Sequence, residues 1–203
     1  MSSHAAAPLV TLASISSSRA AVLSGAGVAF DKVASGVDEA AVKAGLLADG
    51  AGPRDIADAL AELKAVKVSL KRPGLVIGAD QTLDLGGRLY DKAESLDEAR
   101  DRLKALRGQR HRLHASVVVA ENGEPIWRTL ESPTLTMRPF SDTFLEGYLA
   151  RNQEAALSSV GCYWLEGEGA QLFERIDGDY FAILGLPLLG LLDFFRRRGV
   201  LGI

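Results

Sequence analysis

The apolar run Leu75-Val76-Ile77-Gly78-Ala79 leads directly into an acid, Asp80, and this junction constrains the fold more than any other stretch of the chain. A short apolar run of this kind predicts a buried strand in an α/β protein. We expect Asp80 at the carboxyl end of that strand, the edge of an α/β sheet where ligands commonly bind. A carboxylate there can hold Mg²⁺ or act on a water as a general base. On position alone, a turn aspartate is the alternative.

Strand and helix patterns alternate along the rest of the chain, and they predict an α/β fold with a mixed sheet and a cleft. Residues 81–90, with Gly86-Gly87 in the middle, predict a hairpin. Long alternating segments over 112–120 and 126–137 predict an antiparallel pair. The other expected strands cover 9–13, 28–33 and 172–176, and the expected helices begin near residues 20, 39, 53, 97, 144 and 188.

Composition limits the class of protein and its partners. A chain of 203 residues that is 47% hydrophobic can bury a core, and we expect one domain over 1–203 without a separable linker. A net charge of -3 and a pI near 5.7 argue against nucleic acid or an anionic membrane as partner. One cysteine, Cys162, and no secretory signal in Met1–Val10 favour a cytoplasmic location.

A serine-rich turn, residues 14–18, separates the first expected strand from the first expected helix. Backbone N–H groups at a helix N-terminus suit a phosphate, and hydroxyls of Ser14 or Ser16 can add hydrogen bonds. Arg19 can add charge-assisted ones. A serine N-cap with no ligand is the alternative interpretation of this turn.

Three further charged features carry little information alone. Lys64, late in its helix, and Lys92, just after the hairpin, are each ordinarily solvated surface charges. Asp38-Glu39 is explained equally well as a pair of acidic residues at a helix N-terminus, where the helix dipole favours negative charge.

Taken together and in order, these stretches resemble the Maf family of nucleoside triphosphate pyrophosphatases over nearly the whole chain. The opening Leu12-Ala13-Ser14 with Arg19 resembles the family's L-A-S-x-S-P-R-R, and Gly78-Ala79-Asp80-Gln81 resembles its core acid motif. The remaining similarities follow, each with the family motif in parentheses: Asp38-Glu39 (D-E), residues 60–65 (L-A-x-x-K-A), Lys92 (K-P), Gly108 and His111 (G-x-x-H), Glu166-Gly167 (Q/E-G), and Gly185-Leu186-Pro187-Leu188 (G-L-P-L).

The resemblance implies an elongated, twisted, mixed sheet flanked by helices, with two lobes around a cleft, as in ITPase-like folds. It implies attack of water at the α-phosphorus of a nucleoside triphosphate, with Asp80 as the catalytic acid-base residue. It further implies Mg²⁺ or Mn²⁺ held by Glu39 and Asp80, a possible homodimer, and phosphate binding by Ser14, Ser16, Arg19, Lys64 and Lys92.

Two departures from the family pattern lie in the opening loop. Ser17 replaces the usual proline and Ser18 replaces the first arginine, while Arg19 keeps the second. One cationic contact of the loop is therefore missing, and we expect phosphate binding to be weaker or differently arranged. Ala93 likewise replaces the proline that follows the family lysine.

Gln81 and Glu166 resemble the residues of the family branch that acts on 7-methyl-GTP, and Ser18 is a third candidate for base specificity. A carboxylate at Glu166 offers two acceptors, which match the N1–H and N2–H₂ donors of guanine. We therefore expect a purine-leaning enzyme that removes non-standard nucleotides before they are incorporated. Trp164 can stack on a base, with a core position as the alternative. The alternatives in function are a broad-specificity or dTTP/UTP pyrophosphatase, and a nucleotide-binding regulator of septum formation in cell division.

Overall fold

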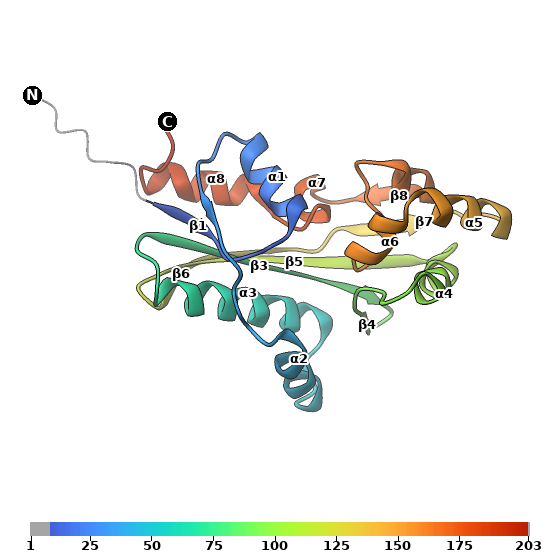
Figure 1. The fold of residues 1–203 in the computed structure, drawn as a ribbon, viewed down its shortest axis with the longest axis horizontal. Helices are drawn as coiled ribbons and strands as arrows, with labels where there is room; N and C mark the ends of the chain where they lie inside the picture. Colours follow the sequence, from blue (N-terminus) through green and yellow to red (C-terminus); the bar gives the residue numbers. More distant parts are fainter. Residues whose placement is uncertain (1–8, 203) are drawn as a thin grey trace, which may run out of the picture.

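An eight-stranded mixed sheet runs the length of the computed structural model, which describes residues 9–202 (Figure 1). The strand order is β2-β1-β3-β5-β7-β8, with β4 paired to β3 and β6 paired to β5; β1 is parallel to β2 and β3, and all other pairs are antiparallel. The strands are β1 (Val10–Leu12), β2 (Asp31–Lys32), β3 (Leu75–Leu85), β4 (Arg88–Tyr90), β5 (Arg110–Glu121), β6 (Glu124–Glu131), β7 (Thr134–Met137) and β8 (Phe173–Asp177).

Helices flank this sheet, as predicted. In Figure 1, α1, α7 and α8 lie over one face and α2 and α3 lie over the other. The helices are α1 (Ser17–Gly25), α2 (Glu39–Ala48), α3 (Pro53–Ser69), α4 (Leu96–Leu106), α5 (Asp142–Arg151), α6 (Gln153–Ser158), α7 (Tyr180–Ile183), α8 (Leu188–Arg197) and the 3₁₀ helix η1 (Glu168–Leu172). No helix within residues 9–202 is both long and apolar enough to cross a membrane.

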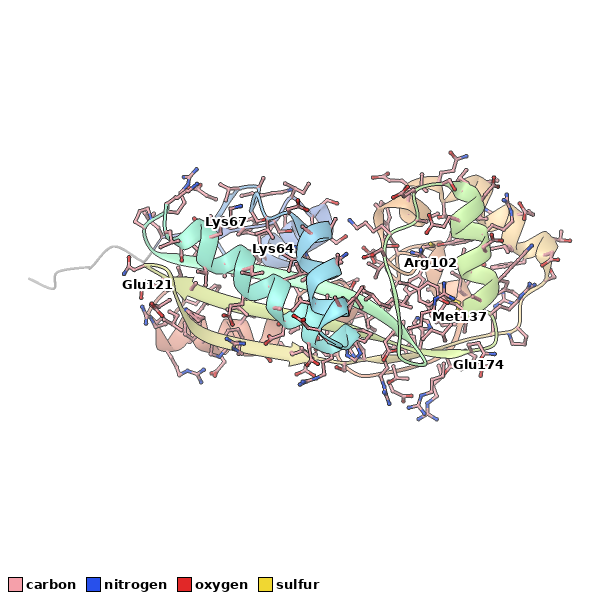
Figure 2. The ribbon with its side chains drawn as sticks, turned by 90° about the horizontal axis from the view of Figure 1, so that it is seen from below. Lys64, Lys67, Arg102, Glu121, Met137 and Glu174 are labelled. Atoms are coloured by element: carbon pink, nitrogen blue, oxygen red, sulfur yellow. The ribbon has the colours of Figure 1, made fainter. Side chains whose placement is uncertain are left out.

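Two lobes share the long strands β3 and β5, which pair from Val76↔Ala120 to Asp84↔Arg112. The first lobe carries β1, β2, β6, α1, α3 and α8, and the second carries β4, β7, β8, α4, α5 and α6. Each has its own hydrophobic core, with Leu12, Ile77 and Phe195 in the first and Leu103, Leu113 and Tyr148 in the second. Figure 2 shows Lys64 and Lys67 in the first lobe and Arg102 and Met137 in the second. The cleft lies where the two lobes meet.

The prediction that the central strand ends at Asp80 is wrong. Strand β3 continues to Leu85, because β5 pairs with it antiparallel through Asp80↔Ser116 and on to Asp84↔Arg112. In contrast to β3, the neighbouring parallel strand β1 does end near this point, because its last residue, Leu12, lies opposite Ile77. Asp80 therefore lies three residues past the carboxyl end of β1, inside a longer strand.

Two other strand predictions also change. The segment 126–137 is divided into β6 and β7 at Pro133, because proline cannot donate to a ladder hydrogen bond. The expected strand over 28–33 is reduced to β2. The predicted hairpin is present: Leu83 pairs with Tyr90 across a turn in which Gly86 and Gly87 have φ of 64° and 89°. Two consecutive positive φ values are typical of a type I′ turn.

Gly78 lets α3 pack closely against β3, two residues before Asp80. A Cβ at this position would lie 2.1 Å from the Ala61 carbonyl oxygen and 2.5 Å from the Ala65 backbone nitrogen. Both obstacles are backbone atoms of α3, so they cannot rotate away. The glycine therefore fixes the distance at which α3 presents Lys64 to the strand.

Replacing Gly78 by alanine is expected to lower the free energy of unfolding by about 1–3 kcal/mol, towards the upper end of what overpacking costs. The shift of α3 should also move Lys64 away from Asp80. Chemical denaturation measures the loss of stability. Gly45→Ala, in α2, is the matched control, since a Cβ there meets nothing within 4 Å. Equal stability of the two variants would contradict this interpretation.

Candidate active site

A cavity of about 1020 Å³ lies between the lobes and is large enough for a nucleotide. Its walls come from the turn after β1, from α2, α3 and β3, from the β4–α4 connection and from the segment that follows α6. All ten residues that the sequence singled out line it, although they come from six separate stretches: Ser14, Ser16, Ser18, Arg19, Glu39, Lys64, Asp80, Gln81, Lys92 and Glu166.

Strand alternation directs Asp80 and Gln81 to opposite faces of β3. Asp80 points toward α3, as Thr82 does, whose hydroxyl donates to the Pro53 carbonyl at the start of that helix at 2.8 Å. Gln81 points toward α7, where its Nε2 donates to the carbonyls of Ala182 (2.8 Å) and Ile183 (3.1 Å). The adjacent residues thus meet different elements at the same cleft.

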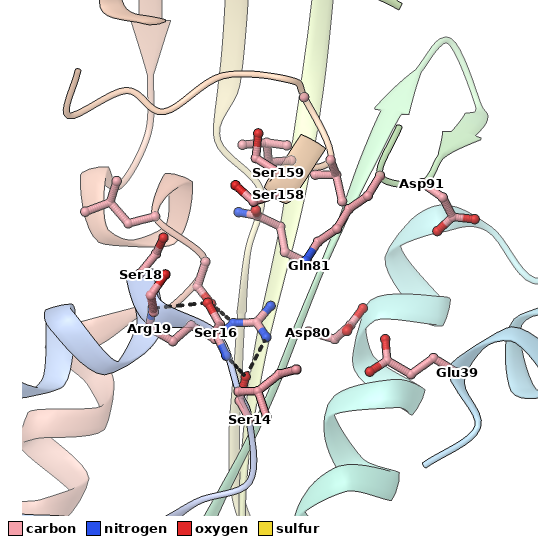
Figure 3. A pocket seen from close by; sticks show the side chains of 18 of the residues that line it. Ser14, Ser16, Ser18, Arg19, Glu39, Asp80, Gln81, Asp91, Ser158 and Ser159 are labelled. Carbon is pink, nitrogen blue, oxygen red and sulfur yellow. Dashed lines mark hydrogen bonds between the residues drawn. The ribbon is translucent and has the colours of Figure 1, made fainter. Parts of the chain in front are cut away.

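Lys64 joins two carboxylates that are distant in sequence. Its Nζ lies 2.7 Å from Asp80 Oδ1 and 2.8 Å from Glu39 Oε1. Lys64 and Asp80 are only 4% and 6% exposed, whereas Glu39 lies at the first position of α2 and is open to the cleft. Asp38 fixes that helix start, because its side chain accepts from Ala41 N. Figure 3 shows Glu39 and Asp80 facing each other.

The serine-rich turn opens helix α1, as predicted. Ser16 is the N-cap and accepts from the backbone N–H of Arg19, while Ser14 Oγ accepts from Ser16 N at 3.2 Å. Ser17, which stands in place of the family proline, is the first helical residue. Proline is favoured there because that N–H has no intrahelical partner, so serine leaves the helix start intact. Ser18 lines the cleft beside it.

Arg19 lies across the cleft from Asp80 (Figure 3). Its Nε donates to the Gly185 carbonyl at 2.9 Å, and its Nη1 donates to Ser14 Oγ at 3.3 Å. Burial lowers the pKa of Arg19 below its ordinary value, while the carboxylates of Asp80 and Glu39 act in the opposite direction. A partly buried guanidinium with N–H groups not used by the protein is well placed to bind an anion.

Lys92, in the second lobe, is close enough to the charged groups of the cleft for them to affect its pKa. Its pKa is lowered, first by partial desolvation in the cleft and then by repulsion from Arg19; Lys64 acts in the same direction, and the carboxylates oppose it. Three cations from three elements therefore act on one region. Such an arrangement is favourable when an anion with several charges lies between them.

Two carboxylates of the site suit a hard divalent cation. Asp80 and Glu39 both direct an oxygen toward the same point, which Lys64 Nζ occupies. Within residues 9–202, no group of three or more His, Cys, Asp or Glu residues is arranged to hold a metal. Magnesium commonly binds one or two carboxylates and takes its other ligands from phosphates and water, so the chemistry of this donor pair is compatible with such an ion.

The sequence did not reveal an ion pair across the mouth of the cleft. Lys43 Nζ on α2 is paired with an Asp91 carboxylate oxygen after β4, and both residues line the cavity. The spacing could have indicated Lys43 as a cleft residue, because Lys43 follows Glu39 by four residues and therefore lies on the same face of the helix. The cleft-lining stretch Ser158–Leu165 was also missed, apart from Trp164.

Comparison with known proteins identifies the family. A family model described as Maf-like protein matches residues 9–198. The chain belongs to the Maf-like protein family. Similar curated proteins include nucleoside triphosphate pyrophosphatases of Caulobacter vibrioides (68% identity; 95% of this chain, 96% of the relative) and Hyphomonas neptunium (54%; 95% and 97%). A 7-methyl-GTP pyrophosphatase of Rhizobium meliloti is 49% identical over 96% of this chain and 98% of its own length.

Membership of the Maf family confirms the resemblance inferred from the sequence. The match extends from β1 to α8, so it includes both lobes and all ten candidate residues. In this Maf-like chain, which has serine at positions 17 and 18, Ser16 is the N-cap of α1 and Arg19 donates to the Gly185 carbonyl.

Proposed function

We propose that this chain hydrolyses nucleoside triphosphates to a nucleoside monophosphate and pyrophosphate. The observation that carries the proposal is the convergence of Asp80, Lys64 and Glu39 with the cations Arg19 and Lys92 in one cleft. The names of the curated relatives support the same reaction. The cavity volume is adequate for the whole substrate.

In the proposed mechanism, the cations hold the triphosphate and Asp80 acts on the water. Arg19, Lys64 and Lys92 bind phosphate oxygens, and free N–H groups at the start of α1 add to this. Asp80 orients the water and takes its proton as the oxygen attacks the α-phosphorus. The bond from that phosphorus to the bridging oxygen breaks, and pyrophosphate leaves with the electron pair.

A divalent cation, Mg²⁺ or Mn²⁺, is part of this proposal. Glu39 and Asp80 would hold it, with the remaining ligands coming from phosphate oxygens and water. When bound, the cation neutralises charge that develops on the phosphoryl and leaving-group oxygens. Lys64, which lies between the two carboxylates, limits their mutual repulsion before substrate and cation arrive.

The preferred base, in our proposal, is a purine and specifically a modified guanine. Glu166 is exposed in the cleft and its carboxylate is free to accept from guanine N1–H and N2–H₂. Gln81 already donates its amide hydrogens to α7, so its carbonyl oxygen remains for a ligand. The Rhizobium meliloti relative is named for 7-methyl-GTP, which supports this choice. Removal of such nucleotides before incorporation is the cellular role that follows.

A panel of triphosphates tests the activity and the base preference together. Pyrophosphate release is measured with Mg²⁺ or Mn²⁺ from 7-methyl-GTP, GTP, dTTP and UTP. We expect turnover that requires the divalent cation and is fastest with 7-methyl-GTP. Absence of turnover with every member would overturn the proposed activity, and a faster reaction with dTTP or UTP would overturn the base preference alone.

Glu166→Gln is expected to shift the preference toward pyrimidines. An amide offers one acceptor and one donor, so one bond from guanine is lost while thymine or uracil gains a partner. The kcat/KM ratio of 7-methyl-GTP to dTTP should fall by about 10–100-fold, the range for a hydrogen bond to a charged group. Glu168→Gln is the matched control, because Glu168 binds Arg151 and Asn152 and does not line the cleft. An unchanged ratio would exclude Glu166 from base recognition.

A further inference from the structure

Trp164 differs from the other aromatic residues around it. It lines the cleft and is half-buried, yet within residues 9–202 none of the hydrophobic clusters includes it. Its neighbour Tyr163 belongs to the core of the second lobe, and Leu165 packs against that core. Trp127 packs against the core of the first lobe and stacks on Phe194 with centroids 5.3 Å apart. The core interpretation of Trp164 is therefore not supported.

The side chain of Trp164 has no partner in the described part of the chain. It takes part in none of the aromatic pairs found there, and its indole N–H donates to none of the described residues. Large indoles usually find both kinds of partner when they serve packing. An indole that borders the cleft without them is available to a ligand.

The backbone that carries Trp164 is firmly held. Tyr163 is anchored at both ends, because its OH lies 2.8 Å from His111 Nε2 and its N–H donates to Ser159 Oγ at 2.9 Å. Burial lowers the pKa of His111 to about 4, so this ring is neutral near pH 7. Tyr148 OH donates to the Cys162 carbonyl at 3.1 Å. The indole is thus presented by a pre-organised segment, which reduces the entropy lost on binding.

The two sides of the cleft differ in charge. The cations of the cleft lining come from α1, α2, α3 and the β4–α4 connection, where Arg19, Lys43, Lys64 and Lys92 lie. The lining stretch 158–166 contributes no lysine or arginine, and its one charged residue is Glu166. When the triphosphate binds on the cationic side, the base lies on the opposite side, next to the indole of Trp164 and the carboxylate of Glu166. That combination favours a planar ring that carries positive charge.

We propose that Trp164 is a base-binding residue whose indole stacks on the base and favours the positively charged 7-methylguanine over neutral bases. This inference rests on the proposed function and adds a residue that sets its substrate preference. Glu166 accepts from the edge of the ring while Trp164 covers its face. The two contacts are independent, because one is a hydrogen bond in the ring plane and the other lies perpendicular to it.

Steady-state kinetics test the proposal with Trp164→Leu, which removes the π-face and keeps apolar bulk, and with Trp164→Phe, which keeps a smaller π-face. In the leucine variant, KM for 7-methyl-GTP should rise about tenfold or more and KM for GTP by clearly less, with phenylalanine intermediate. The change in kcat should be smaller than the change in KM. Trp127→Phe is the control and should leave both constants unchanged. Equal KM values in the leucine variant and the parent protein would overturn the proposal.

Fluorescence separates failure of this inference from failure of the proposed function. In a Trp127→Phe/Asp80→Asn chain, Trp164 is the single tryptophan and the ligand is not consumed. We expect 7-methyl-GTP to quench its emission more strongly than GTP, and inorganic triphosphate to compete without quenching. Binding of 7-methyl-GTP without quenching would overturn the stacking and leave the activity in place. If the parent protein hydrolyses no nucleoside triphosphate and the double variant binds none, both the stacking and the proposed activity would be overturned.

Discussion

Asp80→Asn is expected to lower kcat/KM for pyrophosphate release by about 10²–10⁴-fold, the usual contribution of a positioned general base. Asparagine has nearly the same shape, and its amide oxygen can still accept from Lys64 Nζ, which Asp80 does at 2.7 Å in the native chain. It takes up no proton and binds a divalent cation more weakly. The loss should therefore appear mainly in kcat, with the fold retained.

Asp84→Asn is the matched control for this prediction. Asp84 lies on the same strand and the same face as Asp80, and it accepts from the backbone of the hairpin turn at Gly87. It does not line the cleft. Pyrophosphate release should therefore stay within about threefold of the parent rate, and circular dichroism should report the same fold for both variants. Near-normal activity in Asp80→Asn would show that the chemistry takes place elsewhere.

The sequence predicted ten of the cleft residues through motifs that occur in a fixed order, but it missed Lys43, Asp91 and most of the lining residues in 158–165. It was not sufficient to predict the length of β3. The polar residues after Asp80 were interpreted as the start of a hairpin, and only pairing with β5, about 30 residues further along, makes them part of the strand. Periodicity within one segment carries no information about a distant partner. The break at Pro133 was visible in the sequence, and the rule against proline in a ladder predicts it.

The hydrogen-bond partners of the site could not be predicted for the same reason. Gln81 was expected to contribute to base specificity, but the sequence did not indicate that its amide donates to carbonyls about 100 residues away on α7. Lys43 and Asp91 pair across 48 positions and two lobes. Residue type and spacing indicate which groups can bind a ligand, but the free donors and acceptors depend on contacts made only in the folded chain. For Trp164, the sequence left base stacking and a core position open, and the absence of contacts with the hydrophobic cores favours base stacking.

Lys64→Met is expected to lower the free energy of unfolding by about 3 kcal/mol, the lower end of the range for breaking a buried ion pair. Methionine keeps the apolar stem and removes the ammonium group. The carboxylate of Asp80, at 6% exposure, then remains buried without its close counter-charge. The lower end applies because Arg19 also interacts with Asp80 and because Glu39 is open to water. Chemical denaturation measures the loss, and pyrophosphate release should fall as well.

The double variant Lys64→Met/Asp80→Asn distinguishes an uncompensated charge from lost packing. If the cost comes from the isolated carboxylate, removing that charge should restore much of the stability, and the double variant will be more stable than Lys64→Met alone. If the cost comes from packing, the second change will add to the first. Lys67→Met, one turn along the same helix α3, is the control, because Lys67 is exposed and its one bond within residues 9–202 is to the Gly36 carbonyl. Its cost should be below about 1 kcal/mol. An equal loss in both single variants would show that the buried ion pairs of Lys64 with Asp80 and Glu39 contribute no more to stability than the exposed bond of Lys67.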